Sequence, residues 1–139
     1  MRRGRILVVE DDPAIATVVE EMLTAEGYEV VATGAADALR LARELHPDVI
    51  LLDYAMPGMD GAEISRRLRA DRSTAAIPLI LMSACDPAAR PRMPIDAELR
   101  KPFDLEAMSA VVARWTDTKA PRAQRTPGRA NSTGDPPLP

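Results

Sequence analysis

The sequence predicts an α/β domain in which five strands form a parallel sheet with helices on both faces. Two observations predict this class. The 139-residue chain contains short apolar runs without polar alternation, which is typical of strands buried on both faces. These runs alternate with segments whose apolar residues recur at helical spacing, and the connections are short. Such an alternation forms a parallel sheet covered by helices.

The N-terminal half contains the first two strand–helix pairs. Asp12 and Pro13 are residue types preferred at the N-cap and first position of a helix, and Gly27 suits the position after its C-terminus. The strands expected in this half are Arg5–Val9 and Tyr28–Ala32, and the second helix is expected at Ala35–Leu45. Asp11 and Asp12 fall at the end of the first of these strands.

The third strand, Val49–Leu52, is apolar throughout and follows Pro47. Asp53 comes directly after it, at the carboxyl end of the strand. Asp60 and Glu63 have the spacing of a capping box and begin a third helix. The last elements expected are strands at Ile77–Met82 and Ile95–Arg100 and a helix that Asp104 caps.

Between the fourth and fifth strands the sequence does not favour a helix. This stretch contains Pro87, Pro91 and Pro94, and a proline inside a helix costs about 3 kcal/mol. The fourth helix is therefore expected to be missing or reduced to a turn. With that exception we expect a flavodoxin-like (βα)5 doubly wound sheet with the strand order 2-1-3-4-5.

Composition divides the chain into a domain at residues 1–115 and a tail at residues 116–139. The tail contains five prolines and one large aliphatic residue, so it is expected to be disordered. The domain carries fourteen basic and nineteen acidic side chains, and this net charge of −5 argues against nucleic-acid binding. Arg66, Arg67 and Arg69 are accordingly expected on a solvated outer face.

Several features are missing from the sequence. No apolar run approaches the ~18 residues of a membrane span, and the N-terminal run is too short for a signal peptide. Cys85 is the only cysteine, which excludes a disulfide framework and a cysteine-based zinc site. We therefore expect a cytoplasmic protein without membrane contacts, present as a monomer or weak dimer.

Polar residues occur where four of the predicted strands end. Asp11 and Asp12 end the first strand, and Asp53 ends the third. Ser83 ends the fourth strand and Lys101 the fifth. In the expected sheet these strands end side by side, at the edge where open α/β sheets bind ligands. The five polar groups are therefore expected on one rim.

The chemistry of this rim suggests phosphate and a divalent cation. Close carboxylates repel one another and need a cation or a proton. Oxygen ligands favour Mg²⁺, which takes one or two carboxylates together with water and phosphate oxygens. An Asp carboxylate can attack phosphorus while a metal neutralises the phosphoryl oxygens. Lys101 is one of two lysines against sixteen arginines, which suggests that its position requires a compact charge.

Residues 5–115 resemble the receiver domains of two-component response regulators, in particular single-domain chemotaxis receivers. The matching stretches are ILVVEDD at 6–12, LLDYAMPGMDG at 51–61, MSA at 82–84 and KPF at 101–103. The resemblance implies that Asp53 accepts a phosphoryl group from a histidine kinase or a phosphotransfer protein. It also implies that Asp12, Asp53 and the backbone carbonyl of Ala55 ligate Mg²⁺, with Asp11 acting through water.

The remaining roles follow from the same resemblance. Ser83 would be the switch hydroxyl, and Lys101 would contact the phosphoryl group and precede a cis Lys101–Pro102 bond. The domain would be no enzyme but a phosphoacceptor that assists its own phosphorylation and dephosphorylation. It would signal to an output protein that the sequence does not identify.

Two features depart from the family pattern: the weak fourth helix and Glu98. Many receivers carry Tyr or Phe three residues before the lysine, and this side chain swings inward on activation. A carboxylate at this position would be costly to bury unpaired near Asp53, so Glu98 is expected to stay in solvent. Activation is then expected to reach mainly the loop Ala84–Pro94.

Other functions fit the sequence less well. One alternative is a degenerate receiver that acts as a phosphorylation-independent interaction module. Glu98 and the proline-rich stretch favour it, whereas the complete set of acceptor residues opposes it. A haloacid-dehalogenase-type phosphatase needs a second Asp two residues after the nucleophile, where this chain has Ala55. The glycine motifs of nucleotide-binding proteins are absent from the sequence.

Overall fold

A five-stranded parallel sheet forms the centre of the molecule. The computed structural model describes residues 3–84 and 86–117. The strand order is β2-β1-β3-β4-β5, as predicted from the sequence. The strands are β1 (Arg5–Val9), β2 (Glu29–Thr33), β3 (Val49–Asp53), β4 (Leu79–Ser83) and β5 (Ala97–Arg100).

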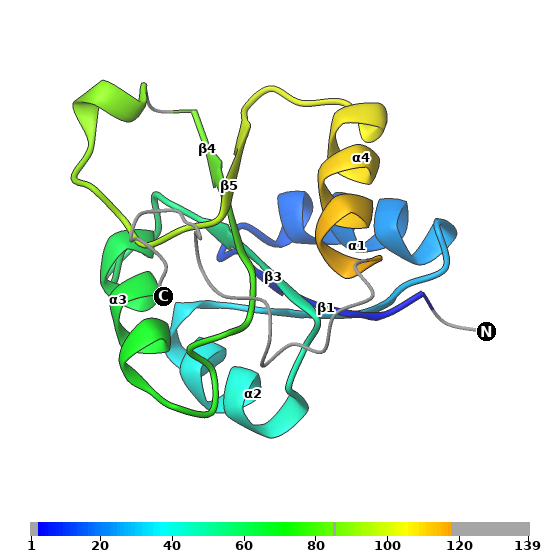
Figure 1. Ribbon diagram of the computed structural model, residues 1–139. Coiled ribbons are helices and arrows are strands. Elements are labelled where there is room, and N and C mark those ends of the chain that lie inside the picture. The colour runs from blue at the N-terminus through cyan, green and yellow to red at the C-terminus, as the bar shows by residue number, and fades with distance from the viewer. Residues whose placement is uncertain (1–2, 85, 118–139) are drawn as a thin grey trace.

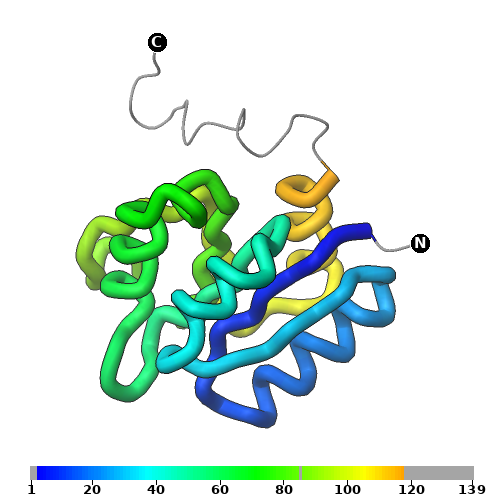
Figure 2. Tube along the Cα trace, turned by 90° about the horizontal axis from the view of Figure 1, so that it is seen from below, coloured from blue at the N-terminus to red at the C-terminus, as the bar shows by residue number. Residues whose placement is uncertain are grey.

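Four α-helices of the described residues cover the two faces of the sheet (Figures 1 and 2). One face packs against α1 and α4, and the other against α2 and α3. The helices are α1 (Pro13–Ala25), α2 (Ala38–Leu45), α3 (Gly61–Ala70) and α4 (Leu105–Thr116).

The residues of β3 show why this strand has to be apolar throughout. Val49 and Leu51 belong to the core under α1 and α4, whereas Ile50 and Leu52 belong to the core under α2 and α3. All four side chains are fully buried. Because successive strand residues point to opposite faces, a strand covered on both sides cannot alternate with polar residues. Asp53 is the first polar side chain of β3.

Three of the helices begin at the aspartates that were predicted to cap them. The carboxylate of Asp12 accepts hydrogen bonds from the first turn of α1. Asp60 accepts one from the Glu63 N–H, and Asp104 accepts one from the Ala107 N–H. Gly27 follows the end of α1 with φ of 100°, a left-handed conformation that glycine adopts without strain.

The boundaries differ from the predicted ones by one or two residues in places. β4 begins at Leu79 rather than Ile77, because Pro78 has no N–H to donate to the sheet. β5 begins at Ala97 rather than Ile95, and β2 covers Glu29–Thr33. The expected helix at 35–45 begins with a 3₁₀ turn, Ala35–Asp37, and α2 follows it.

The described residues between β4 and β5, 84 and 86–96, contain no α-helix, which confirms the prediction of a reduced fourth helix. Residues 86–96 are called the β4–β5 segment below. A single 3₁₀ turn, Pro87–Ala89, begins at Asp86, whose carboxylate accepts a hydrogen bond from the Ala88 N–H. Met93 and Ile95 pack against the core under α2 and α3. Side chains therefore hold this segment where a helix would otherwise cover the sheet.

Arg69 is not on a solvated outer face, contrary to the expectation from sequence. Its side chain is 14% exposed, and Nη2 lies 2.6 Å from Asp96 Oδ2. The guanidinium also donates hydrogen bonds to the carbonyls of Ala75, Ile77 and Pro94. Arg66 and Arg67, in contrast, are half-exposed and pair with Glu63 on the same helix. Arg69 thus joins α3 to the strands that follow it.

The expectation that Glu98 stays in solvent is also wrong for this structure. Its side chain is 18% exposed, and Oε1 lies 2.7 Å from Nη2 of Arg90, which is itself 8% exposed. The expectation failed because burying an unpaired carboxylate is costly, whereas this carboxylate has a partner from the β4–β5 segment.

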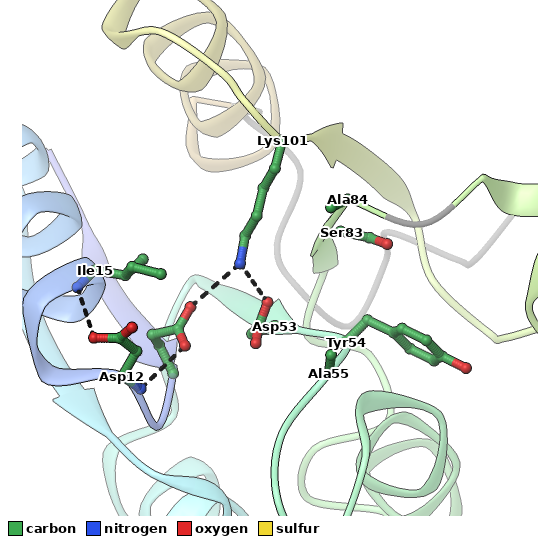
Figure 3. Close-up of a pocket in the computed structure, with 9 residues that line it drawn as sticks. Asp12, Ile15, Asp53, Tyr54, Ala55, Ser83, Ala84 and Lys101 are labelled. Carbon is green, nitrogen blue, oxygen red and sulfur yellow. Dashed lines mark hydrogen bonds and ion pairs between the residues drawn. The ribbon is translucent and has the colours of Figure 1, made fainter.

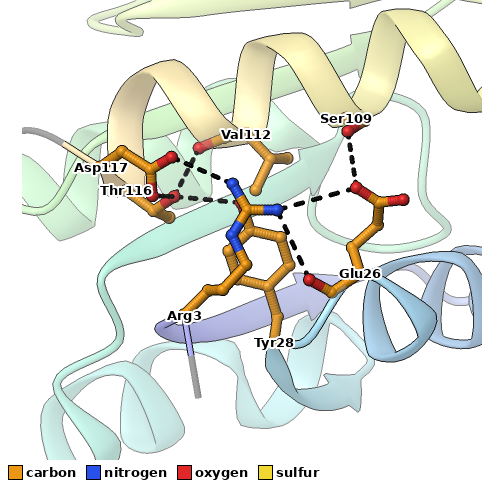
Figure 4. Close-up of polar contacts among 7 residues, drawn as sticks. All are labelled: Arg3, Glu26, Tyr28, Ser109, Val112, Thr116 and Asp117. Atoms are coloured by element: carbon orange, nitrogen blue, oxygen red, sulfur yellow. Dashed lines mark hydrogen bonds and ion pairs between the residues drawn. The ribbon is translucent and has the colours of Figure 1, made fainter. Parts of the chain in front are cut away.

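Arg3 ties the N-terminus of the domain to the end of α4 (Figure 4). Its guanidinium lies 4.8 Å from the centre of the Tyr28 ring and 3.0 Å from Asp117 Oδ2. Tyr28 Oη and Thr116 Oγ1 are 3.3 Å apart. Helix α4 ends at Thr116, one residue beyond the predicted domain boundary. The rest of the predicted disordered tail, residues 118–139, lies outside the described residues.

A membrane span would require a longer and more apolar helix than any in residues 3–84 and 86–117.

Candidate phosphate and metal site

The carboxyl ends of β1, β3, β4 and β5 surround a pocket of about 500 Å³. The side chains that line it come from the ends of these strands and from the residues that follow them (Figure 3). The pocket brings together Asp12, Asp53, Ser83 and Lys101, which were predicted to lie on one rim. Ala55, whose carbonyl was expected to bind a metal, lines it too.

Asp53 and Lys101 form the centre of this pocket. Asp53 is 4% exposed, and its Oδ1 accepts a hydrogen bond of 2.7 Å from Lys101 Nζ. The backbone N–H of Lys101 donates to the Ser83 carbonyl at 2.8 Å, which fixes the start of this side chain beside β4. The Lys101–Pro102 peptide bond is cis, as the resemblance implied. The lysine both neutralises the aspartate and orients it.

Glu10 is the site residue that the sequence reasoning missed. It follows β1 directly, is 6% exposed and lines the same pocket. Its Oε2 accepts a hydrogen bond of 3.2 Å from the Asp12 N–H. Its Oε1 lies 3.7 Å from Lys101 Nζ but has no hydrogen-bond partner. A third carboxylate thus lies beside Asp53 with one oxygen unsatisfied.

Strand alternation was the signal that could have identified Glu10. Val8 of β1 and Leu51 of β3 are paired in register and belong to the same core cluster. Two residues further along, Glu10 and Asp53 extend beyond these partners on the same face of the sheet. Asp11, one residue away from Glu10, is expected to point elsewhere.

Asp11 does turn away from the pocket. Its Oδ1 accepts a hydrogen bond of 2.9 Å from the Ala35 N–H, at the start of the 3₁₀ turn after β2. Gly34 leaves room for this contact, since a Cβ at that position would clash with the same oxygen. Asp11 does not line the pocket. Its predicted role at a metal through water stays a prediction.

Asp12 both caps a helix and lines the pocket. Its Oδ1 accepts hydrogen bonds from the N–H groups of Ala14 and Ile15, at 2.9 and 3.5 Å, and so caps α1. The same residue lines the pocket, where Figure 3 shows it on the side opposite Ser83. Capping therefore uses one oxygen of this carboxylate, and its predicted role as a metal ligand stays a prediction.

The donor groups of the pocket suit Mg²⁺. In residues 3–84 and 86–117, no three acidic, histidine or cysteine side chains are placed to hold a metal ion as they stand. Mg²⁺, however, needs only one or two carboxylates, with water and phosphate oxygens completing its shell. Asp53, the unsatisfied Glu10 Oε1 and the Ala55 backbone supply oxygen donors at one pocket. The residues present therefore fit this ion.

Glu10 is also the ionisable group that the pocket disturbs. Burial raises the pKa of its carboxyl, and the neighbouring charge of Asp53 raises it further. A carboxyl whose pKa is higher in the folded state binds its proton more tightly there. It therefore contributes stability at low pH that is lost as the pH rises through the folded-state pKa.

Replacing Glu10 by Gln is therefore expected to stabilise the protein at pH 7 in the absence of divalent cations. The amide keeps the shape of the side chain and removes a buried charge beside Asp53, so the melting temperature should rise by a few degrees. The difference from the wild type should shrink as the pH falls through the raised pKa of Glu10, because the carboxyl then takes up a proton and loses its charge. Melting curves in EDTA at several pH values test this, and a variant that is less stable at pH 7 would contradict it.

The sequence also matches known proteins. Residues 6–113 match the model of the response regulator receiver domain. Over 115 residues the chain is 39% identical to the DNA-binding dual master transcriptional regulator RpaA of Synechocystis sp., covering 78% of this chain and 47% of that protein. Over 84 residues it is 48% identical to the response regulator PleD of Caulobacter vibrioides, covering 60% and 18%. The chain thus spans less than half the length of these curated relatives.

Solved structures resemble the domain closely. The receiver domain of the sensor histidine kinase PA1611 from Pseudomonas aeruginosa has a TM-score of 0.76 and 30% identity, covering 83% of this chain and 98% of that chain. That structure has a magnesium ion coordinated in its active site cleft. The chemotaxis response regulator CheY4 of Vibrio cholerae has a TM-score of 0.74 and 26% identity, covering 80% and 97%.

Proposed function

Because the chain belongs to the response regulator receiver domains of two-component signalling, we propose that Asp53 accepts a phosphoryl group from a phosphohistidine. The donor would be a histidine kinase or a phosphotransfer protein. The observation that carries this proposal is the position of the Asp53 carboxylate. It lies at the end of a buried strand, in a polar pocket, with a lysine ammonium 2.7 Å from one oxygen.

The transfer uses groups already in the pocket. An oxygen of Asp53 attacks phosphorus, the phosphorus–nitrogen bond of the donor breaks, and the imidazole leaves and takes up a proton. Lys101 holds Oδ1, which orients the carboxylate so that its other oxygen can attack. As charge develops on the phosphoryl oxygens, Lys101 Nζ and the Ser83 hydroxyl are donors that can hold them.

The domain would be a phosphoacceptor that assists its own phosphorylation and dephosphorylation, rather than an enzyme with a free substrate. The output partner would be a protein. Arg40, Arg66 and Arg67 each pair with a carboxylate on the surface, so they form no unpaired basic patch for nucleic acid. DNA binding in the relatives' names belongs to those proteins.

Acetyl phosphate with Mg²⁺ tests the proposal without the cognate kinase. We expect the intact mass of the protein to rise by one phosphoryl group. Hydroxylamine should remove this group, because it cleaves acyl phosphates but not phosphoserine or phosphothreonine. A protein that acquires no phosphoryl group under any Mg²⁺ concentration would instead support an interaction module that works without phosphorylation.

Mg²⁺ is the cofactor that we propose for this transfer, and when bound it neutralises phosphoryl oxygens. Glu10, Asp53 and the Ala55 carbonyl would hold it. Asp12 was predicted from sequence as a ligand; one of its oxygens caps α1, so we rank it below Glu10, whose Oε1 is buried without a partner. Asp11, whose Oδ1 accepts a hydrogen bond from the Ala35 N–H, keeps its predicted role through water as a prediction.

We therefore expect Glu10→Gln to weaken Mg²⁺ binding more than Asp12→Ser does. Serine retains the N-cap and removes the carboxylate, so this variant separates the two roles of Asp12. Isothermal titration with MgCl₂ should give a dissociation constant at least about tenfold higher for Glu10→Gln, because changing even an outer-shell partner of a metal site commonly lowers affinity by about 10- to 100-fold. Equal losses for both variants would place Asp12 among the ligands, and an unchanged Glu10→Gln would remove Glu10 from them.

A further inference from the structure

The Arg90–Glu98 ion pair joins the β4–β5 segment to the sheet. Arg90 belongs to the segment and Glu98 to the edge strand β5, and both side chains are largely buried. Because side chains alternate along a strand, Glu98 points to the other face of β5 from Leu99, which packs in the core under α1 and α4. A buried ion pair between a segment with little regular structure and a sheet edge is unusual, since charges are seldom buried without a specific role.

The pair is incompletely satisfied. Arg90 Nε and Glu98 Oε2 are both buried without a hydrogen-bond partner. Taking two charges out of water is costly, and the attraction between them repays this cost only when their remaining polar atoms are also bonded. The pair is therefore less strongly stabilised than a buried pair whose polar atoms are all hydrogen-bonded.

The β4–β5 segment begins beside the pocket and leads into β5, whose far end returns to it. Ser83 and Ala84, just before the segment, line it, and β5 ends directly before Lys101. Glu98 is paired in register with Leu81, two residues before Ser83. A shift of Ser83 or Lys101 towards a phosphoryl group therefore displaces both partners of the ion pair relative to each other.

The far end of the segment is fixed differently. Arg69 donates hydrogen bonds to the Pro94 carbonyl at 3.0 Å and to Asp96 at 2.6 Å. Between the pocket and this anchor, Arg90 pairs with Glu98. Loss of that pair would leave the stretch around Arg90 less firmly held, while Met93 still packs against the core and Pro94 stays attached.

We propose that the Arg90–Glu98 ion pair holds the β4–β5 segment on the sheet in the unphosphorylated protein, and that occupation of Asp53 by a phosphoryl group releases it. This inference rests on the proposed function, because it makes release the consequence of phosphorylation. Release would expose the Arg90 guanidinium and the Glu98 carboxylate to solvent.

Hydrogen exchange followed by mass spectrometry tests the holding role in the unmodified protein. Glu98→Gln removes the charge that keeps Arg90 buried, so amide exchange in residues 86–93 should become at least tenfold faster. Exchange in β1 and β3 should stay unchanged. Arg92→Met is the matched control, because Arg92 is an exposed arginine of the same segment with no ion pair among the described contacts. Exchange in Glu98→Gln equal to that in Arg92→Met would overturn the holding role.

A second variant shifts the equilibrium the other way. Arg90→Met with Glu98→Leu replaces the ion pair by apolar groups, which commonly hold a buried contact at least as well. This double variant should keep residues 86–93 protected. Loss of protection there, as in Glu98→Gln, would show that the segment depends on local packing rather than on the ion pair.

Beryllofluoride with Mg²⁺, a phosphoryl mimic, tests the coupling. In the wild type it should accelerate exchange in residues 86–93. By thermodynamic reciprocity, Glu98→Gln should bind beryllofluoride roughly fivefold more tightly than the wild type, and the apolar double variant more weakly. Equal affinities, or unchanged exchange in a protein saturated with beryllofluoride, would refute the release. A wild type that binds no beryllofluoride and takes up no phosphoryl group would instead refute the proposed function.

Discussion

Asp53→Asn is expected to abolish labelling by acetyl phosphate while the protein remains folded. The amide has nearly the same shape as the carboxylate, and its oxygen can still accept the hydrogen bond from Lys101. It lacks the anionic oxygen that has to attack phosphorus. Intact-mass measurement after incubation with acetyl phosphate and Mg²⁺ should therefore show the full mass shift in the wild type and none in the variant.

The stability of Asp53→Asn gives an independent check on the site. Asp53 is one of the charges that raise the pKa of Glu10, so its removal should leave the melting temperature in EDTA unchanged or higher. Mg²⁺ should stabilise the variant less than the wild type. A variant that melts far below the wild type would make lost labelling uninformative, which is why both measurements belong together.

Asp37→Asn is the matched control for this variant. Asp37 is an exposed aspartate that pairs only with the surface residue Arg40 within the described contacts, far along the chain from the pocket residues. It should be labelled as fully as the wild type. Undiminished labelling of Asp53→Asn would assign the phosphoryl group to another side chain and contradict the proposed acceptor.

The fold could be predicted in detail because it depends on local patterns. Apolar runs such as Val49–Leu52 have no alternation, since both faces of the sheet are covered. Asp12, Asp60 and Asp104 precede helices and cap them with their own side chains. Prolines between β4 and β5 exclude a helix by local sterics. Each of these signals lies within a few residues of its effect.

The site was predicted in part. Strand order brings Asp53, Ser83 and Lys101 together, and this order follows from the fold. Which of three consecutive acidic residues faces the pocket depends on side-chain direction after a strand has ended. Strand alternation continues through Glu10, whereas Asp11 is drawn to the Ala35 N–H. The sequence contains no sign of that contact, because Ala35 is unremarkable as a residue.

Long-range ion pairs were beyond the reach of sequence reasoning. Three chemically identical arginines lie within four residues, at positions 66, 67 and 69. Of these, only Arg69 lies inward, where it donates a hydrogen bond to Asp96, 27 residues further along the chain. Glu98 likewise has a partner that no periodicity indicates. Both ion pairs connect the β4–β5 segment, or the residue that ends it, to other elements. Long-range ion pairs thus occur where a fourth helix would otherwise pack.

Arg69→Met is expected to cause the largest loss of stability among substitutions outside the core. The Arg69 side chain is 14% exposed and donates hydrogen bonds to Asp96 and to the carbonyls of three residues. Its loss leaves a largely buried Asp96 carboxylate with only the Leu79 N–H as a hydrogen-bond donor among the described contacts. Breaking a buried pair in this way costs about 3–5 kcal/mol. The melting temperature should therefore fall by roughly 10–20 °C.

Arg66→Met is the control for this prediction, since it makes the same substitution one helical turn away. Arg66 is 53% exposed and pairs with Glu63 in solvent, so its loss should change the free energy of unfolding by less than about 0.5 kcal/mol. Adding Asp96→Asn to Arg69→Met removes the unpaired charge while keeping an acceptor for the Leu79 N–H. Urea unfolding of Arg69→Met, of Asp96→Asn and of the variant that combines them should then give a coupling energy above about 1 kcal/mol, because Arg69 and Asp96 act as one unit. Additive losses would mean that Arg69 stabilises the domain through its bonds to the backbone carbonyls rather than through Asp96.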